Sequence, residues 1–241
     1  MTPSRTIDYT KYPVPRIRHH ANPTLYLPES NHRVRLSYYP PLVSPNWRDL
    51  FADGHPPAWL DVGSGMGKFL IETALSTPQK NILGIELRKT AVEWVQSVLQ
   101  GEHIPNAALL WYSVVNGLPF IEDHSIEKIF YFFPDPWVKK KHHKRRAFST
   151  ALLDEFARIL RPDGVLYLMT DVPEVDEYQR QVIAEHGYFS CTPISSDAEW
   201  DLGVRTDQER FCLKKNIPYV RLTCVPTVEQ RRGRYDQSSH S

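Results

Sequence analysis

From residue 58 onward, short apolar segments alternate with amphipathic segments, and this alternation constrains the fold most strongly. Apolar runs of this length predict buried strands, and apolar residues at helical spacing predict helices. The predicted strands are 58–63, 81–87, 107–112, 126–133, 165–171 and 219–225, and the predicted helices are 67–77, 90–100, 149–161 and 174–186. Strands that alternate with helices predict an α/β fold with a parallel sheet covered on both faces.

The first 57 residues differ from the rest because they contain half of the chain's 20 prolines. Proline limits regular structure, so we expect residues 1–57 to form a partly ordered arm with one short helix at 44–52. Residues 1–12 are expected to be a disordered tail. The main domain is predicted at 58–228, and the polar segment 229–241 is predicted to be disordered.

The cysteines and the hydropathy pattern indicate a cytoplasmic protein. Cys191, Cys212 and Cys224 form no CxxC pair and are odd in number, so neither a disulfide framework nor a zinc site is expected. No signal peptide and no apolar run near the ~20 residues of a membrane span is visible, and no membrane partner is expected.

A glycine-rich turn follows the first predicted strand and indicates a nucleotide-like ligand. Gly63, Gly65 and Gly67 allow backbone to approach a ligand closely. Glu86 ends the second strand, where a carboxylate can accept both hydroxyls of a ribose. The loop lacks G-x-G-x-x-G spacing, and Asp61 would repel a pyrophosphate. These features favour a cationic ligand such as S-adenosylmethionine over a dinucleotide; a purely structural turn is the alternative.

The segment FFPDPWVKKKHHKRR, residues 132–146, follows the fourth predicted strand. Pro134 and Pro136 restrict the backbone on both sides of Asp135, and Trp137 offers a flat face for a wall or for a base. Residues 139–146 carry six positive charges, although the whole chain has a net charge of +1. A phosphate backbone is the natural partner of such a block, and a solvated charge run is the alternative.

These motifs resemble the tRNA (guanine-N(7))-methyltransferase family. RIRHHANP (16–23) is similar to the family's N-terminal element, and LDVGSGMGKF and LGIELR are similar to its cofactor loops. FPDPW followed by Lys, His and Arg is its most specific signature. MTD (169–171) and RTDQER (205–210) resemble its remaining elements, so the resemblance extends over most of the chain.

The resemblance implies a Rossmann-like class I methyltransferase fold with a mostly parallel seven-stranded sheet. It implies methyl transfer from S-adenosylmethionine to N(7) of a guanosine in the variable loop of tRNA, and Asp135 as the catalytic residue. The cofactor-binding residues it implies are Asp61, Gly63, Gly65, Glu86, Arg88 and Ser113. The substrate-binding residues are Lys139, Asp171, Thr206 and Glu209, and the expected tRNA-backbone contacts are Lys140, Lys141, Lys144, Arg145 and Arg146.

Two positions depart from the family pattern. Ser113 stands where Asp or Asn commonly binds the adenine amine, and it can supply that bond only through its hydroxyl or its backbone. Asp61 replaces the usual Glu of the first strand and is one methylene shorter.

The sequence leaves three alternative functions open. An amino-group methyltransferase of nucleic acid is the nearest, but its motif runs [DN]-P-P-[YFW] rather than F-P-D-P-W. A non-catalytic RNA-binding protein and a nicotinamide-dependent reductase are the others. We expect tRNA as partner, no DNA and no metal, and the sequence identifies no partner subunit.

Overall fold

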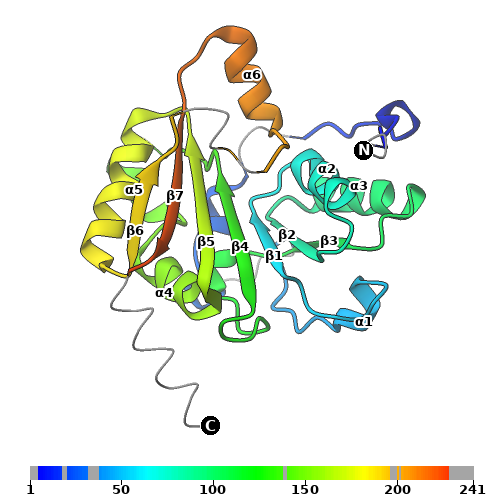
Figure 1. Cartoon of the computed structure of the whole chain (residues 1–241), viewed down its shortest axis with the longest axis horizontal. Coiled ribbons are helices and arrows are strands. Elements are labelled where there is room, and N and C mark those ends of the chain that lie inside the picture. Colours follow the sequence, from blue (N-terminus) through cyan, green and yellow to red (C-terminus); the bar gives the residue numbers. More distant parts are fainter. Residues whose placement is uncertain are drawn as a thin grey trace. The chain divides into compact units, whose positions relative to one another are not determined.

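The computed structural model describes residues 5–17, 21–31, 38–137, 140–195, 200 and 202–227, with backbone alone at 140, 141 and 144 (Figure 1). Seven strands form one sheet in the order β3-β2-β1-β4-β5-β7-β6. The strands are β1 (Trp59–Val62), β2 (Ile82–Glu86), β3 (Ala107–Trp111), β4 (Ile126–Phe132), β5 (Leu160–Thr170), β6 (Phe189–Pro193) and β7 (Val220–Pro226). β7 runs antiparallel to β5 and β6, and the pairs β1–β2, β2–β3 and β4–β5 are parallel. The predicted mostly parallel seven-stranded sheet is therefore confirmed.

The chain divides into two compact units. The first contains residues 1–116 and 202–207. Its helices are α1 (Trp47–Leu50), α2 (Lys68–Ser76) and α3 (Lys89–Gly101). All side chains of β1 and β2 are buried, as expected for strands covered by helices. Phe69, Leu70 and Ala74 of α2, together with Val95 and Val98 of α3, complete this core.

Within the first unit, the start of the N-terminal arm packs on α3 through an aromatic contact and hydrogen bonds. The ring of Tyr9 stacks on that of Trp94 with their centroids 6.0 Å apart. The Tyr12 hydroxyl donates to Glu102 Oε1 at 2.9 Å, and Trp94 Nε1 donates to the Tyr12 carbonyl at 3.2 Å. The expected disordered tail is therefore wrong for residues 5–12, because two tyrosines and a capped turn (Tyr9–Lys11) dock this segment on α3. The division at residues 57 and 228 stays a prediction.

The second unit contains residues 117–201 and 208–241 and includes α4 (Thr150–Ile159), α5 (Pro173–His186) and α6 (Asp207–Lys215), whose first residue falls in the first unit. Ser149 caps α4 by accepting from the Leu152 amide, and α5 begins with Pro173 and ends at Gly187 with φ of 73°. The N-cap serine and the two flanking residues of α5 match cap positions in the sequence, whereas α4 ends at Ile159 and passes directly into β5 at Leu160. In Figure 1, β7 lies between β5 and β6.

A disulfide joins Cys191 in β6 to Cys224 in β7, so the expectation of no disulfide is wrong. The two residues are register partners in the antiparallel pair, with Cα atoms 4.0 Å apart. Strand pairing brings together cysteines that are 33 residues apart in the sequence, and their spacing along the chain does not reveal this. Cys212 is free and buried.

In the part of the chain that the structure describes, no helix is both long and apolar enough to cross a membrane. Over the same residues, no cluster of three or more His, Cys, Asp or Glu side chains is arranged to hold a metal ion.

Candidate cofactor and substrate sites

The loop after β1 has a backbone that only glycine adopts readily. Gly63, Gly65 and Gly67 have φ of +83°, +59° and +66°. A Cβ at Gly67 would lie 2.7 Å from Val95 Cγ2, so α2 can approach α3 only with glycine there. A Cβ at Gly63 would meet no atom within 4 Å, so this part of the turn faces open space.

Asp61 is buried in β1 with one carboxylate oxygen unsatisfied. It is 3% exposed, and its Oδ2 has no hydrogen-bond partner among the described residues. Burial raises the pKa of Asp61 to about 7, and the nearby charge of Glu86 acts in the same direction. A buried carboxylate of this kind is costly unless a donor or a cation meets it. Together with the open turn at Gly63, it fits the positively charged amino-acid end of S-adenosylmethionine.

Glu86, at the end of β2, is buried and already holds four donors. Its Oε2 accepts from the Gly65 amide at 2.8 Å and from Arg88 Nη2 at 3.1 Å. Its Oε1 accepts from the amide and Nε of Arg88 at 2.9 and 2.8 Å. Glu86 is therefore rigidly oriented, and a ribose hydroxyl that reached it would have to share the carboxylate with Arg88. Its role in ribose binding stays a prediction.

Ser113, just after β3, is hydrogen-bonded to the N-terminal arm. Its hydroxyl donates to the Leu25 carbonyl at 2.9 Å, and the side chain is buried. Leu25 packs with Ala21 and Tyr39 in a small apolar cluster. The hydroxyl hydrogen of Ser113 is thus used within the protein, which leaves its oxygen lone pairs or its backbone for the predicted adenine contact.

The FPDPW segment is bracketed by two residues with unusual backbone. Phe133 and Trp137 have φ of 45° and 37°, a region that bulky residues rarely adopt. The Phe133 amide donates to the Met169 carbonyl at 2.7 Å, which fixes the start of the segment to β5. Asp135 therefore sits on a backbone constrained at both ends, as the two prolines predict.

Trp137 is covered by the basic segment that follows it. The Arg145 guanidinium lies over its ring at 5.1 Å from the centroid, and the His142 ring meets it edge-on at 5.7 Å. A base could stack on Trp137 only by displacing these groups or on another face.

The structure describes only part of the basic segment 139–146. Lys139 and the side chains of Lys140, Lys141 and Lys144 fall outside the described residues. The segment Lys140–Arg145 forms a 3₁₀ helix. The guanidinium carbon of Arg146 lies 4.3 Å from the centroid of the Tyr178 ring.

The predicted substrate residues Asp171 and Glu209 take different positions within the second unit. Asp171 Oδ2 accepts from Gln208 Nε2 at 2.8 Å and lies 3.6 Å from the Cys212 sulfur. Burial, with Asp171 acting in the same direction, raises the pKa of Cys212 to about 11, so this thiol stays protonated.

Glu209 is fully buried and forms an ion pair with Arg221. The Tyr219 hydroxyl donates to Glu209 Oε1 at 3.1 Å, and the Arg221 guanidinium lies over the Trp200 ring at 4.8 Å. Glu209 thus anchors α6 to β7, and its contact with a substrate stays a prediction. No sequence pattern points to Arg221 and Tyr219, because both lie in a segment with the pattern of an ordinary strand.

Thr206 lies at the start of α6 and is described with the first unit. Its neighbour Asp207 forms an ion pair with Lys68, the first residue of α2, with 3.3 Å between Oδ2 and Nζ. Thr206 therefore lies near the start of α2, the helix that follows the glycine-rich loop. No contact to a substrate is described for it.

Known proteins with similar sequences and folds show the class of protein to which this chain belongs. The family model described as "Putative methyltransferase" matches residues 55–221. The solved structure of the 16S rRNA methyltransferase KamB has the same fold, with a TM-score of 0.51 and 18% identity over 75% of this chain and 90% of that one. The fold and the family model thus place the chain in the class of Rossmann-like methyltransferases.

Curated relatives give the family. A tRNA (guanine-N(7)-)-methyltransferase of Synechococcus sp. (strain JA-2-3B'a(2-13)) is 30% identical over 86% of this chain and 82% of the relative. One from Prochlorococcus marinus (strain NATL1A) is 32% identical over 77% of this chain and 90% of the relative. The chain belongs to the tRNA (guanine-N(7))-methyltransferase family.

Proposed function

We propose that this chain transfers a methyl group from S-adenosylmethionine to N(7) of a guanosine in the variable loop of tRNA. The observation that carries the proposal is the similarity over most of the chain to relatives that bear this activity in their names. We also propose that the protein acts in the cytoplasm, where its tRNA substrate is found.

The residues on β1 and β2 suit the methyl donor. Asp61 would meet its cationic amino-acid end, Gly63 would allow close approach, and Glu86 would face its ribose. When bound, S-adenosylmethionine supplies an electrophilic methyl group on a sulfonium. The contribution of the chain is to orient this group and to exclude water from it.

The chemistry at guanine requires little acid–base assistance. N(7) has a free lone pair and no proton to lose, so no general base is needed. The purine gains positive charge as the bond forms, and a fixed carboxylate stabilises that charge. Asp135, held between two prolines and two strained residues, would supply this field and accept from the guanine N–H groups.

The test is to incubate the protein with radiolabelled methyl donor and unmodified tRNA, digest the RNA and identify the labelled nucleoside. We expect 7-methylguanosine. Label on an exocyclic amino group would instead support the amino-group methyltransferase, and absence of both methyl transfer and cofactor binding would support a non-catalytic RNA-binding protein.

A further inference from the structure

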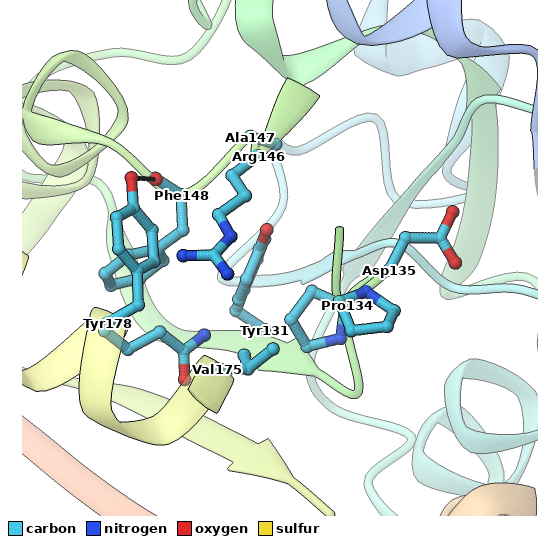
Figure 2. A pocket seen from close by; sticks show the side chains of 10 residues that line it. Tyr131, Pro134, Asp135, Arg146, Ala147, Phe148, Val175 and Tyr178 are labelled. Atoms are coloured by element: carbon cyan, nitrogen blue, oxygen red, sulfur yellow. Dashed lines mark hydrogen bonds between the residues drawn. The ribbon is translucent and has the colours of Figure 1, made fainter. Parts of the chain in front are cut away.

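A small pocket in the second unit lies behind the FPDPW segment (Figure 2). Pro134 and Asp135 form one wall, and Tyr131, Arg146 and Phe148 form another. Val175, Tyr178 and Gln179 of α5 complete it, although nothing in the family resemblance assigns α5 a role. The space admits roughly one water-sized group.

Two hydrogen-bond donors of this pocket lack an acceptor. Gln179 is 1% exposed, and its Nε2 has no partner among the described residues. Arg146 Nε is also buried and also has no hydrogen-bond acceptor among the described residues. Buried donors are nearly always paired, so two on one pocket indicate a group that brings acceptor oxygen.

The charge of Arg146 is fixed in place and lacks a carboxylate partner in the described part of the chain. Its guanidinium lies 4.3 Å from the Tyr178 ring centroid, and the Tyr178 hydroxyl donates to the Phe148 carbonyl at 2.9 Å. In Figure 2 the Asp135 carboxylate points away from this guanidinium. The other walls are largely apolar, so the pocket offers donors and positive charge to a small group.

We propose that this pocket binds a non-bridging phosphate oxygen of the RNA substrate, held by Arg146 and Gln179. This inference rests on the proposed function and adds a contact to it. A phosphate oxygen matches the unpaired donors, the positive charge and the small space, whereas a nucleobase is too large. Because Pro134 and Asp135 form one wall, the phosphate would belong to a nucleotide next to the target guanosine, and Gln179 would be a positioning residue.

The test compares two charge changes on one helix. Gln179→Glu places a carboxylate in the pocket, and Gln181→Glu places one on the exposed face of α5. Binding of an unmodified tRNA transcript is measured without methyl donor, with Tm as a check on folding. We expect Gln179→Glu to weaken RNA binding by on the order of tenfold or more. Gln181→Glu should stay within about twofold.

Two further variants separate Gln179 from Arg146 and guard against misfolding. Gln179→Leu should weaken binding on the order of tenfold without changing the salt dependence, because the charge of Arg146 remains. Arg146→Gln should also lower the slope of log affinity against log salt by about 0.7–0.9. A methylphosphonate replaces one non-bridging oxygen of a single phosphate in the RNA. At the one position whose phosphate enters the pocket, this substitution should abolish the difference in RNA affinity between wild type and Gln179→Leu.

The outcomes distinguish this inference from the proposed function. If wild type methylates tRNA and folded Gln179→Leu binds RNA as wild type does, the pocket holds only a buried water and the inference is wrong. If wild type binds RNA with the expected sensitivity at Gln179 but transfers no methyl group, the inference stands and the proposed function fails. A wild-type chain that binds no RNA overturns both.

Discussion

At the scale of single residues, Asp135 is the most direct test of the proposed chemistry. Asp135→Asn keeps the shape of the side chain and removes the negative charge that we propose faces the developing purine cation. We expect turnover to fall about a hundredfold, with binding of S-adenosylhomocysteine and tRNA retained. Single-turnover kinetics at saturating substrates measure this, and Asp163→Asn, an exposed change of the same charge, is the control. Near wild-type turnover would show that Asp135 is structural.

Asp61 gives a prediction with a defined pH dependence. Burial raises its pKa from the ordinary value of 3.8 to about 7 in the folded protein, so the folded state retains a proton that the unfolded chain has released. The stability contributed by this group is fully present below about pH 4 and is lost as pH rises through 7. Asp61→Asn should therefore raise Tm relative to wild type at pH 8 and have less effect at pH 5.

The same substitution should weaken cofactor binding, because a neutral amide cannot pair with an ammonium group. For wild type, affinity for S-adenosylhomocysteine should fall as pH drops below 7, by up to about tenfold per unit, since Asp61 must lose its proton on binding. Calorimetry in buffers of different ionisation enthalpy would detect this proton. Unchanged affinity in Asp61→Asn would contradict the assignment.

The residues proposed for the cofactor and guanosine sites can be recognised in the sequence because each lies in a local pattern. The glycine turn, the acid at the end of β2 and the Pro-Asp-Pro segment each follow a strand that its apolar run reveals. Residues whose roles depend on a distant partner were missed. Gln179 is one polar residue on an amphipathic helix, and only the tertiary structure turns its side chain into a pocket with Arg146.

At the scale of secondary-structure elements, the attachment of α6 to β7 depends on a buried ion pair. Glu209 and Arg221 are 0% and 6% exposed. Glu209→Gln leaves the Arg221 charge buried without its partner and should destabilise the protein by roughly 3–5 kcal/mol. The double variant Glu209→Gln, Arg221→Met removes both charges and should lose much less stability than Glu209→Gln alone. Urea unfolding of wild type, both single variants and the double variant measures the coupling, and additive losses would show that the pair is not coupled.

The elements that sequence analysis missed are those with weak apolar patterns. β6 reads FSCTP, in which only Phe189 is fully buried, and α6 buries just Glu209 and Cys212 among its described residues. Neither segment has the apolar periodicity of a strand or a helix. β6 is held by pairing with β7, and α6 is held by the contacts of Glu209 with Arg221 and Tyr219. β5 also begins earlier than predicted, at Leu160 rather than at 165, because pairing with β4 extends the strand into the end of the predicted helix 149–161.

At the scale of the whole molecule, charge is unevenly distributed. The chain carries +1 in total, and residues 139–146 carry +6, so the remainder carries −5. A protein with this distribution attracts a polyanion to one segment and repels it elsewhere. The segment that attracts it follows Asp135 directly in the sequence, so docking of RNA and presentation of a guanosine are expected to depend on the same stretch of chain.

Neutralising part of this segment should change RNA binding and leave the methyl donor unaffected. Lys141→Gln with Lys144→Gln would remove two of the expected phosphate contacts, each of which would contribute about 0.7–0.9 to the salt slope of log affinity. We expect a shallower slope by roughly 1.4–1.8, a raised KM for every tRNA tested and an unchanged KM for S-adenosylmethionine, because phosphate contacts position RNA without reading its sequence. Lys214→Gln with Lys215→Gln, at the exposed end of α6, removes the same charge and should leave the slope nearly unchanged. Equal slopes in the two double variants would mean that the basic segment is only a solvated charge run.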